Sequence, residues 1–268
     1  SLAFFTAFAV HALNLALRAY ISGHAPWSDA YESLVYISLI SVLAGVLFFK
    51  HQSFALGAAS LFASVSLLVA HLNFINPQIT NLVPVLKSFW LSVHVSVITA
   101  SYGFLGFGFV LGLVGLILMA LKNDKNEQKL SEQIRYLAAT DELSLIIGLS
   151  LLTIGNFLGG VWANESWGRY WGWDSKESWS YITIIVYAIV LHLRFIPKLR
   201  GVFAFLTASV LSFASVLFTY FGVNFYLSGL HSYANGESFG VSGLIYLILA
   251  ALALLIALAY RGRDIKVV

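Results

Sequence analysis

The side chains with the most distinctive chemistry are tryptophans that crowd one short segment. Five of the seven tryptophans lie between residues 162 and 179, together with several glycines. Flat apolar rings suit a large planar apolar ligand, and glycines let the backbone approach such a ligand closely. An interfacial aromatic belt is the alternative, but a belt spreads its rings over many helix ends on both membrane faces. The clustering therefore favours a built site for a ligand such as a porphyrin.

Two histidines on either side of this segment could hold the iron of such a ligand. His94 precedes the tryptophans, and His231 follows them in a stretch, 223–240, that has no Lys or Arg. Neutral imidazole is the usual protein ligand for haem iron, and two imidazoles give a six-coordinate, low-spin site. For either histidine alone, a hydrogen-bonded polar residue is the simpler interpretation. The neighbouring tryptophans make iron ligation the preferred hypothesis for both.

The other histidines fall elsewhere along the chain. His192 lies about 12 residues, or roughly 18 Å, into an expected membrane span, so it is too deep to reach an outer site. His24 belongs to a Gly-His-Ala-Pro turn and is interpreted as structural. His11 lies within a span, where an intramembrane hydrogen bond is the simplest role. Two more flank the third span, where a polar tip can meet water: His51 and His71.

The elements that position these residues are membrane-spanning helices. The chain is 59% apolar and only 10% charged, too little charge to cover a water-soluble globule. Each span needs about 20 mostly apolar residues. The sequence predicts an all-α polytopic membrane protein with a Trp-rich outer loop and about eight spans, near 1–20, 31–49, 52–72, 88–121, 141–160, 180–196, 201–222 and 241–260. The fourth would extend about 50 Å and is expected to protrude from the bilayer.

Basic residues indicate the orientation. Eleven of the fifteen Lys and Arg fall in connections that share one side, so the positive-inside rule places both termini in the cytoplasm or stroma. The charge-rich stretch 122–140 is expected to be a solvated connection with a short amphipathic helix. Function is expected on the opposite face, in segments 21–30, 161–179 and 223–240. The chain is treated as a single domain over 1–268, and its apolar start without Met predicts a segment or partner upstream.

The tryptophan segment carries a family resemblance. Residues 167–174 read Trp-Gly-x-Tyr-Trp-x-Trp-Asp, which resembles the WWD signature of the haem-handling protein family. The flanking Trp-Ala-Asn-Glu-Ser-Trp and Lys-Glu-Ser-Trp, and Gly-His-Ala-Pro-x-Ser-x-x-Tyr-Glu at 23–32, look like the CcsA part of system II (CcsBA) cytochrome c synthetases. The likeness spans essentially the whole chain.

The resemblance implies a function in cytochrome c biogenesis. A protein of this kind exports haem b across a bacterial plasma membrane or thylakoid membrane, and works with a CcsB-like subunit or fused domain. As a haem lyase on the outer face it forms thioether bonds to the Cys-x-x-Cys-His motif of apocytochrome c. Because this chain has no cysteine, the thiols must come from the apocytochrome c. No nucleic acid partner is expected.

The resemblance also assigns the residues of the site. It implies that His94 and His231 are axial ligands and that His192 is the membrane histidine. Arg169 and Lys176 are candidate partners for the haem propionates, with plain surface charge as the alternative. The expected haem contacts are Trp162, Trp167, Gly168, Tyr170, Trp171, Trp173, Asp174 and Trp179.

Two other functions fit parts of the pattern. A CcmC-like haem-delivery protein shares the motif but makes no covalent bond, so only the covalent product separates the two. A di-haem cytochrome b typically needs histidine pairs about 13 residues apart on facing helices, with one ligand near each membrane surface. Only His11 and His24 have that spacing, and Gly23 and Pro26 end the helix there. The cytochrome b alternative is therefore disfavoured.

Overall fold

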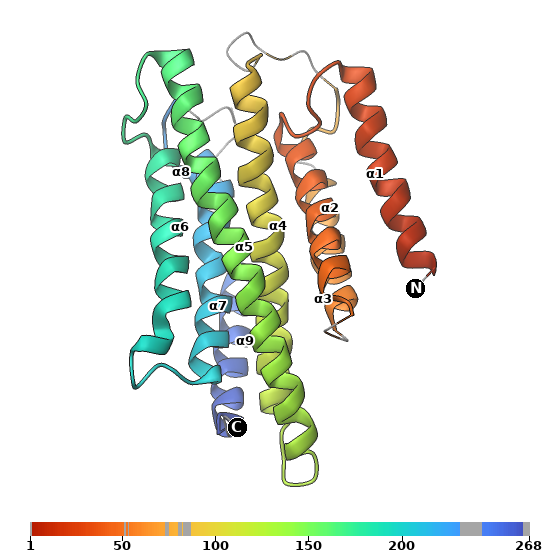
Figure 1. Cartoon of the computed structure of the whole chain (residues 1–268), viewed down its shortest axis with the longest axis vertical. Coiled ribbons are helices and arrows are strands. Elements are labelled where there is room, and N and C mark those ends of the chain that lie inside the picture. Colours follow the sequence, from red (N-terminus) through yellow and green to blue (C-terminus); the bar gives the residue numbers. More distant parts are fainter. Residues whose placement is uncertain are drawn as a thin grey trace. The chain divides into compact units, whose positions relative to one another are not determined.

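The computed structural model describes residues 2–50, 52, 54–72, 75–79, 82, 87–230 and 243–264. Regular structure within these residues is entirely helical (Figure 1). The α-helices are α1 Leu2–Ser22, α2 Ala30–Phe48, α3 Ala55–Ala70, α4 Phe89–Ala120, α5 Glu127–Trp167, α6 Ser175–His192, α7 Val202–Leu217, α8 Val223–Tyr226 and α9 Gly243–Ala259. Shorter helical turns are η2 Leu193–Phe195, the π-helix η3 Phe218–Gly222, and η4 Tyr260–Gly262.

The helices have the lengths of membrane spans. Seven helical stretches in the described part of the chain are long and apolar enough to cross a bilayer. The expected third span is occupied by α3, whose 16 residues fall short of that length. α4 is a single helix of 32 residues, which corresponds to about 48 Å. The prediction of an all-α polytopic membrane protein is confirmed.

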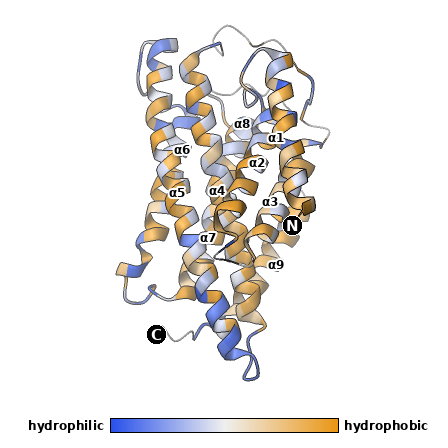
Figure 2. Ribbon diagram, turned by 45° about the vertical axis from the view of Figure 1, so that its right-hand side comes forward, coloured by the Kyte–Doolittle hydropathy of each residue, from blue (hydrophilic) through white to orange (hydrophobic). Residues whose placement is uncertain are grey.

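The charge-rich stretch after α4 differs from its prediction as a separate connection. α5 begins at Glu127 and runs 41 residues to Trp167 without a break, so the expected amphipathic helix and fifth span are one helix. Its first turns are helical because one face is apolar: Ile134 and Leu137 are fully buried. Figure 2 shows hydrophilic residues concentrated at the turn that joins α4 to α5.

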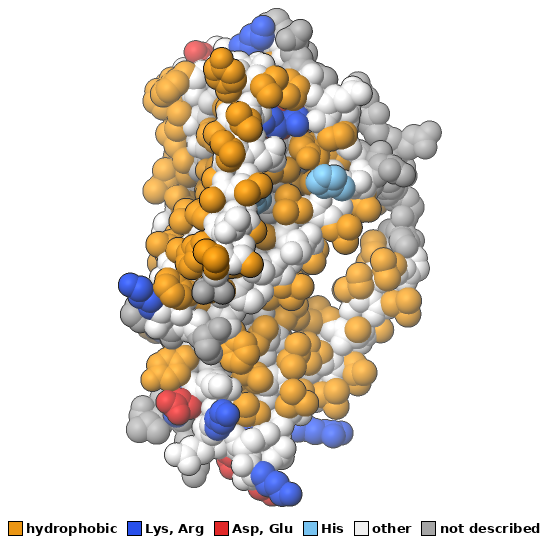
Figure 3. Space-filling model, turned by 90° about the vertical axis from the view of Figure 1, so that its right-hand side faces the viewer, with side chains coloured by type: hydrophobic (Ala, Val, Ile, Leu, Met, Phe, Trp, Pro, Cys, Tyr) orange, Lys and Arg blue, Asp and Glu red, His pale blue; other side chains and the backbone are white. Residues whose placement is uncertain are grey.

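The chain forms two compact units. Unit 1 comprises residues 1–107 and 147–172, and unit 2 comprises 108–146 and 173–268, so α4 and α5 contribute one part to each. In unit 1, α2 packs along α3, with Gly45 against Ala59. The side of α1 that faces the viewer in Figure 3 is almost wholly hydrophobic, with Val10, Leu13 and Leu17 exposed. Such a surface suits contact with lipid.

Unit 2 has its own hydrophobic core. Residues from α4, α5, α7 and α9 meet there, namely Leu116, Met119, Ile134, Leu206, Val210 and Ala259. Glycines on α4 allow close helix contact, because a methyl group on Gly112 would lie 2.9 Å from Val210 Cγ2. These helices support the part of the tryptophan segment that belongs to unit 2, residues 173–179.

Candidate functional site

In unit 1 the site is built around His94, in the second turn of α4. Its Nδ1 lies 2.7 Å from the carbonyl oxygen of Gly155 on α5. A carbonyl can only accept a hydrogen bond, so Nδ1 carries the proton and donates it, and the lone pair lies on Nε2. A fixed tautomer of this kind is what a metal-ligating histidine requires.

Glycines make room for the His94 ring. A methyl group on Gly159 would lie 2.5 Å from His94 Cε1 and 2.8 Å from Nδ1. The imidazole therefore lies against bare backbone of α5, one helical turn beyond the carbonyl to which it is bonded. The hydrogen bond and the close backbone contact together fix the orientation of the ring.

Tryptophans support His94 from the same unit. The Trp162 ring stacks on the imidazole at a centroid distance of 6.3 Å and an angle of 12°, and it packs edge-on against Trp167 at 4.7 Å. Trp162 is completely buried. It therefore supports the histidine ring, and its expected contact with haem stays a prediction.

The turn between α1 and α2 also holds α4 near His94. Trp27 Nε1 donates to the carbonyl of Ser92 at 2.9 Å. The turn itself is fixed by Glu32, which accepts hydrogen bonds from Arg18 Nε at 2.8 Å and from the Ser28 amide at 3.0 Å. Asp29 caps α2, and burial raises the pKa of its carboxyl group. The motif at 23–32 thus acts as a structural clamp in unit 1.

The loop of the WWD motif is shorter than predicted. α5 continues to Trp167 and α6 begins at Ser175, so much of the expected outer segment 161–179 is helical. Gly168 ends α5 with a φ of 72°, a left-handed conformation typical of the residue after a helix. Asp174 starts α6 as the N-cap of a capping box with Glu177. Only seven residues, 168–174, lie between the helices.

The unit 1 part of this loop exposes an aromatic and a cation. Tyr170 is 64% exposed. The Arg169 guanidinium lies 5.6 Å from the centre of the Trp167 ring, and its side chain extends across Gly172, where a methyl group would collide with it. Trp171 is partly buried.

The unit 2 part begins with Trp173, which has a strained backbone and an exposed ring. Among the described residues, it is the one residue other than glycine with a positive φ, which is 58°. Such a conformation is unfavourable for a bulky side chain. The residue is nevertheless 71% exposed, and its carbonyl accepts a hydrogen bond from Ser178 Oγ at 3.3 Å. Strain of this kind is often retained where a side chain has to be presented for function.

Asp174 connects the motif to the segment that precedes His231. Its Oδ1 accepts a hydrogen bond from the Leu230 amide at 2.8 Å, and its Oδ2 accepts one from the Lys176 amide at 3.3 Å. Ser175 Oγ donates to the Ser228 carbonyl at 2.8 Å in the same region. The carboxylate of Asp174 therefore holds backbone, and its expected contact with haem stays a prediction.

Lys176 and Trp179 are both engaged inside unit 2. Lys176 Nζ donates to Asn224 Oδ1 at 2.9 Å. The Trp179 ring packs on Phe218 of η3 at 4.1 Å. These contacts give each side chain a structural partner within its own unit.

The remaining histidines differ in their positions and in their hydrogen-bond partners. His192 is the last residue of α6, exposed, with Nδ1 2.6 Å from the Ala188 carbonyl. Since α6 starts at Ser175, this places it about 25 Å along the helix. His11 makes the expected intramembrane hydrogen bond, from Nε2 to the Val35 carbonyl at 3.0 Å. His24 and His71 bond to nearby carbonyls, while His51 and His231 lie outside the described residues.

Two residues of the unit 1 site were not predicted. Gly155 supplies the carbonyl for His94, and Gly159 supplies the space for its ring. Their Gly-xxx-Gly spacing is a signal for close helix contact, although it does not reveal which side chain fills the groove. No group of three or more His, Cys, Asp or Glu suited to a metal ion occurs among the residues that the structure describes.

Fold and site together define a polytopic helical membrane protein with an aromatic, histidine-containing site. Residues 27–231 match the family of cytochrome C assembly proteins, and the chain belongs to this family. It is 59% identical over 230 residues to protein NrfI of Wolinella succinogenes, covering 86% of this chain and 25% of that protein. It is 35% identical to the cytochrome c biogenesis protein CcsA of Prochlorococcus marinus, covering 87% of this chain and 82% of CcsA.

A similar relative comes from an alga. The cytochrome c biogenesis protein CcsA of Chlamydomonas reinhardtii is 40% identical, over 82% of this chain and 64% of that protein. The chain therefore spans most of the length of one CcsA relative but only a quarter of NrfI. Its family places the chain in cytochrome c biogenesis, the process predicted from the WWD motif.

Proposed function

We propose that this chain binds haem b and catalyses its covalent attachment to apocytochrome c, acting with a CcsB-like membrane subunit or fused domain. The single observation that carries the proposal is the fixed His94 tautomer beside the WWD motif: Nδ1 donates to Gly155, and the ring rests on Gly159. Family membership in cytochrome c assembly supports the identity of the ligand.

The residue types suit a haem. His94 Nε2 provides an axial ligand, and His231, on the sequence pattern, the second. Exposed rings at Tyr170 and Trp173 offer apolar surface for the macrocycle. Arg169, beside Trp167, is a candidate partner for a propionate because a guanidinium pairs well with a carboxylate. Lys176 is a weaker candidate, since its ammonium already bonds to Asn224.

The proposed reaction is an addition without net oxidation. Each thiol of a Cys-x-x-Cys-His segment adds across one vinyl group of the haem, so that a C–S bond and a C–H bond form while the S–H bond and the C=C double bond are consumed. The chain holds the haem and directs the segment to it. Holding reactants in a near-attack geometry can lower a barrier by about 7 to 11 kcal/mol.

The proposed orientation places the WWD loop on the outer (periplasmic or lumenal) face and the chain termini in the cytoplasm or stroma. Unit 2 supports it, because basic residues gather at one of its ends: Lys122 Nζ bonds to the Asp264 carbonyl, and Arg194 pairs with Glu142. Asp174 and Leu230 meet at the WWD end of the same unit. Basic residues favour the cytoplasmic side of a bacterial plasma membrane or the stromal side of a thylakoid membrane.

The deciding experiment is product formation. The chain is produced with its natural CcsB-like partner and an apocytochrome c, and covalent haem is measured by haem staining after denaturing electrophoresis. We expect stain on the apocytochrome, and none when both thiols of its motif are replaced by serine. Haem that co-purifies with the chain but never becomes covalent would favour a CcmC-like delivery protein, and a chain without haem would refute the proposal.

A further inference from the structure

Unit 2 contains an aspartate whose charge has no partner in the described part of the chain. Asp141, on α5, is completely buried. Its Oδ1 accepts a hydrogen bond from Ser209 on α7 at 3.1 Å, and its Oδ2 is buried with no hydrogen bond. Burial of an ionised carboxylate without a cation is very costly in a membrane helix bundle.

The surroundings of Asp141 are closely packed and almost free of charge. A methyl group on Gly108 of α4 would lie 2.7 Å from Oδ1, and one on Gly112 would lie 3.5 Å from Oδ2. The glycines of α4 thus bring backbone up to the carboxyl group. Neither α4 within unit 2 nor α7 carries a titratable residue. The adjacent Glu142 pairs with Arg194, so that cation is already neutralised.

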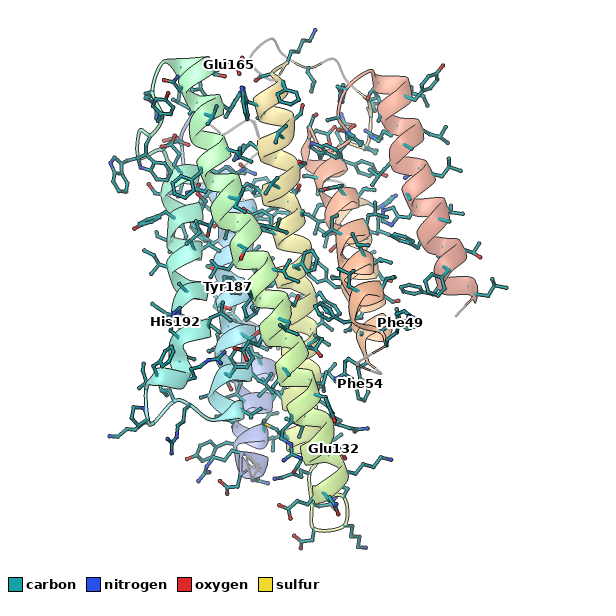
Figure 4. All side chains as sticks on the ribbon, in the orientation of Figure 1. Phe49, Phe54, Glu132, Glu165, Tyr187 and His192 are labelled. Atoms are coloured by element: carbon teal, nitrogen blue, oxygen red, sulfur yellow. The ribbon has the colours of Figure 1, made fainter. Side chains whose placement is uncertain are left out.

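A second unsatisfied polar group faces the same place. Tyr187, on α6, is completely buried, and its hydroxyl makes no hydrogen bond. It lies near Ser212 of α7, whose own hydroxyl donates at 2.7 Å to the carbonyl of Ser209, the residue that bonds to Asp141. Figure 4 labels Tyr187 and His192 on α6, of which the first is completely buried and the second is exposed. Asp141 Oδ2 and the Tyr187 hydroxyl are therefore two buried oxygen atoms without a hydrogen bond, linked through Ser209 and Ser212 of α7.

We propose that Asp141 and Tyr187 form a proton-binding site within the helix bundle of unit 2, in which the Asp141 carboxyl group carries an exchangeable proton at neutral pH. Protonation removes the buried charge and turns Oδ2 into a donor, with the Tyr187 hydroxyl as its acceptor, directly or through one water. Release of the proton would place a negative charge against the α4 backbone at Gly108 and Gly112. The packing of α4, α5 and α7 is therefore coupled to the occupancy of this site.

A proton fits this site better than a metal ion. A sodium or other hard cation needs several oxygen ligands. The described residues contain no group of three or more His, Cys, Asp or Glu that could hold a metal ion, and the neighbouring carboxylate of Glu142 is paired with Arg194. A single proton satisfies the charge with no further ligand.

The test is infrared spectroscopy of the full protein with its natural partner in lipid. We expect the C=O band of a protonated carboxylic acid at pH 7, shifted to lower wavenumber after exchange into D2O. Asp141→Asn should abolish the band, whereas Glu142→Gln, the matched change at the ion-paired neighbour, should leave it. Tyr187→Phe should move the band to higher wavenumber, because it removes the hydrogen-bond partner.

A label keeps the test independent of these variants. The chain has five aspartates, and Asp141 is the one that is completely buried, so carboxyl-13C aspartate should shift the band in the unmodified protein. The proposal is overturned if the unmodified protein shows no protonated-acid band at pH 7, or if the label does not shift it. It is equally overturned if sodium ions remove the band, or if Asp141→Asn or Tyr187→Phe leaves it unchanged. Haem content plays no part in this readout, so failure of the haem proposal remains a separate result.

Discussion

The imidazole of His94 lies against the α carbon of Gly159, at a spacing that leaves no room for a methyl group between them. A Cβ at position 159 would come within 2.5 Å of His94 Cε1, closer than side chains tolerate. The ring also donates its Nδ1 proton to the Gly155 carbonyl at 2.7 Å. Two glycines of α5, separated by one turn, therefore determine where His94 Nε2 can point.

Gly159→Ala should disturb the haem site without removing a ligand. The added methyl group must displace the imidazole, which weakens the Gly155 hydrogen bond and misdirects Nε2. We expect the low-spin haem spectrum to become mixed-spin. Gly57→Ala, also in a helix of unit 1 but with open space at its Cβ, is the control and should behave as the unmodified protein. A normal spectrum for Gly159→Ala would argue against the fixed-ring interpretation.

Replacement of a proposed axial ligand should change the coordination of the iron. His94→Ala or His231→Ala leaves five-coordinate or water-bound iron, so the reduced spectrum should move from low spin toward high spin. Exogenous imidazole should restore a low-spin spectrum in either variant. His71→Ala is the control, because this exposed histidine bonds only to the Leu67 carbonyl of its own helix and contacts Tyr31. If both ligand variants stayed low-spin, the ligands would have to be reassigned.

The sequence predicts the helices well because each span is a long apolar run. It predicts their ends less well, since capping depends on local conformation that hydropathy does not report. Gly168 ends α5 with a φ of 72°, and the Asp174 side chain caps the start of α6. Seven residues, 168–174, therefore lie between the two helices within the expected segment 161–179. The sequence predicts a connection and a separate span where the structure has the single helix α5. The reason is that charged residues on one helical face resemble a solvated connection when hydropathy is averaged.

The sequence predicts which residues form the site, but it does not report the contacts that hold them in place. Trp162 appears in the sequence as one tryptophan among five, and only the fold shows that it is completely buried and stacked on His94. Asp174 is predicted to contact haem, and only the fold shows that its oxygens also accept hydrogen bonds from the amides of Lys176 and Leu230. Such contacts join residues that are distant in sequence, and no local pattern reports them.

His192→Ala should lower the haem content without changing the spectrum of the haem that remains. His192 lies at the opposite end of α6 from Asp174, about 25 Å along the helix, so it cannot ligate iron at the WWD end. If His192 acts in haem entry, its loss affects only how much haem reaches the outer site. The measurement is haem per protein together with the reduced spectrum. Altered ligation at full occupancy would show that His192 takes part in the outer site.

Asp174 should act through the backbone that it holds. Asp174→Ala removes the N-cap of α6, at a cost of about 1 kcal/mol, and releases the Leu230 amide next to His231. Asp174→Asn keeps a capping oxygen. We therefore expect Ala to lower both thermal stability and haem retention, and Asn to retain most of each. Equal loss of haem in both variants at unchanged stability would instead indicate that the negative charge itself contacts the ligand.

Trp173 should contribute to haem retention through its ring and leave the ligation unchanged. The residue is 71% exposed and has a strained backbone with a φ of 58°. Most of its ring is therefore available to contact a ligand. Burial of an aromatic side chain against a ligand stabilises the complex by about 1.5 to 3 kcal/mol. Trp173→Ala should therefore weaken haem retention by about tenfold or more, and Trp171→Ala should act in the same direction. The spin state should remain low in both variants.

A matched control separates this effect from the loss of any exposed aromatic. Tyr20 on α1 is 86% exposed and lies outside the motif, so Tyr20→Ala should leave haem content unchanged. Haem loss is measured by transfer to excess apomyoglobin, which reports the dissociation rate independently of the amount loaded. Because Trp173→Ala removes no iron ligand, faster loss with an unchanged low-spin spectrum is the expected result. If the variant instead released haem at the normal rate but attached less of it to apocytochrome, the Trp173 ring would be a docking surface for the apoprotein, and contact with the macrocycle would have to come from other side chains.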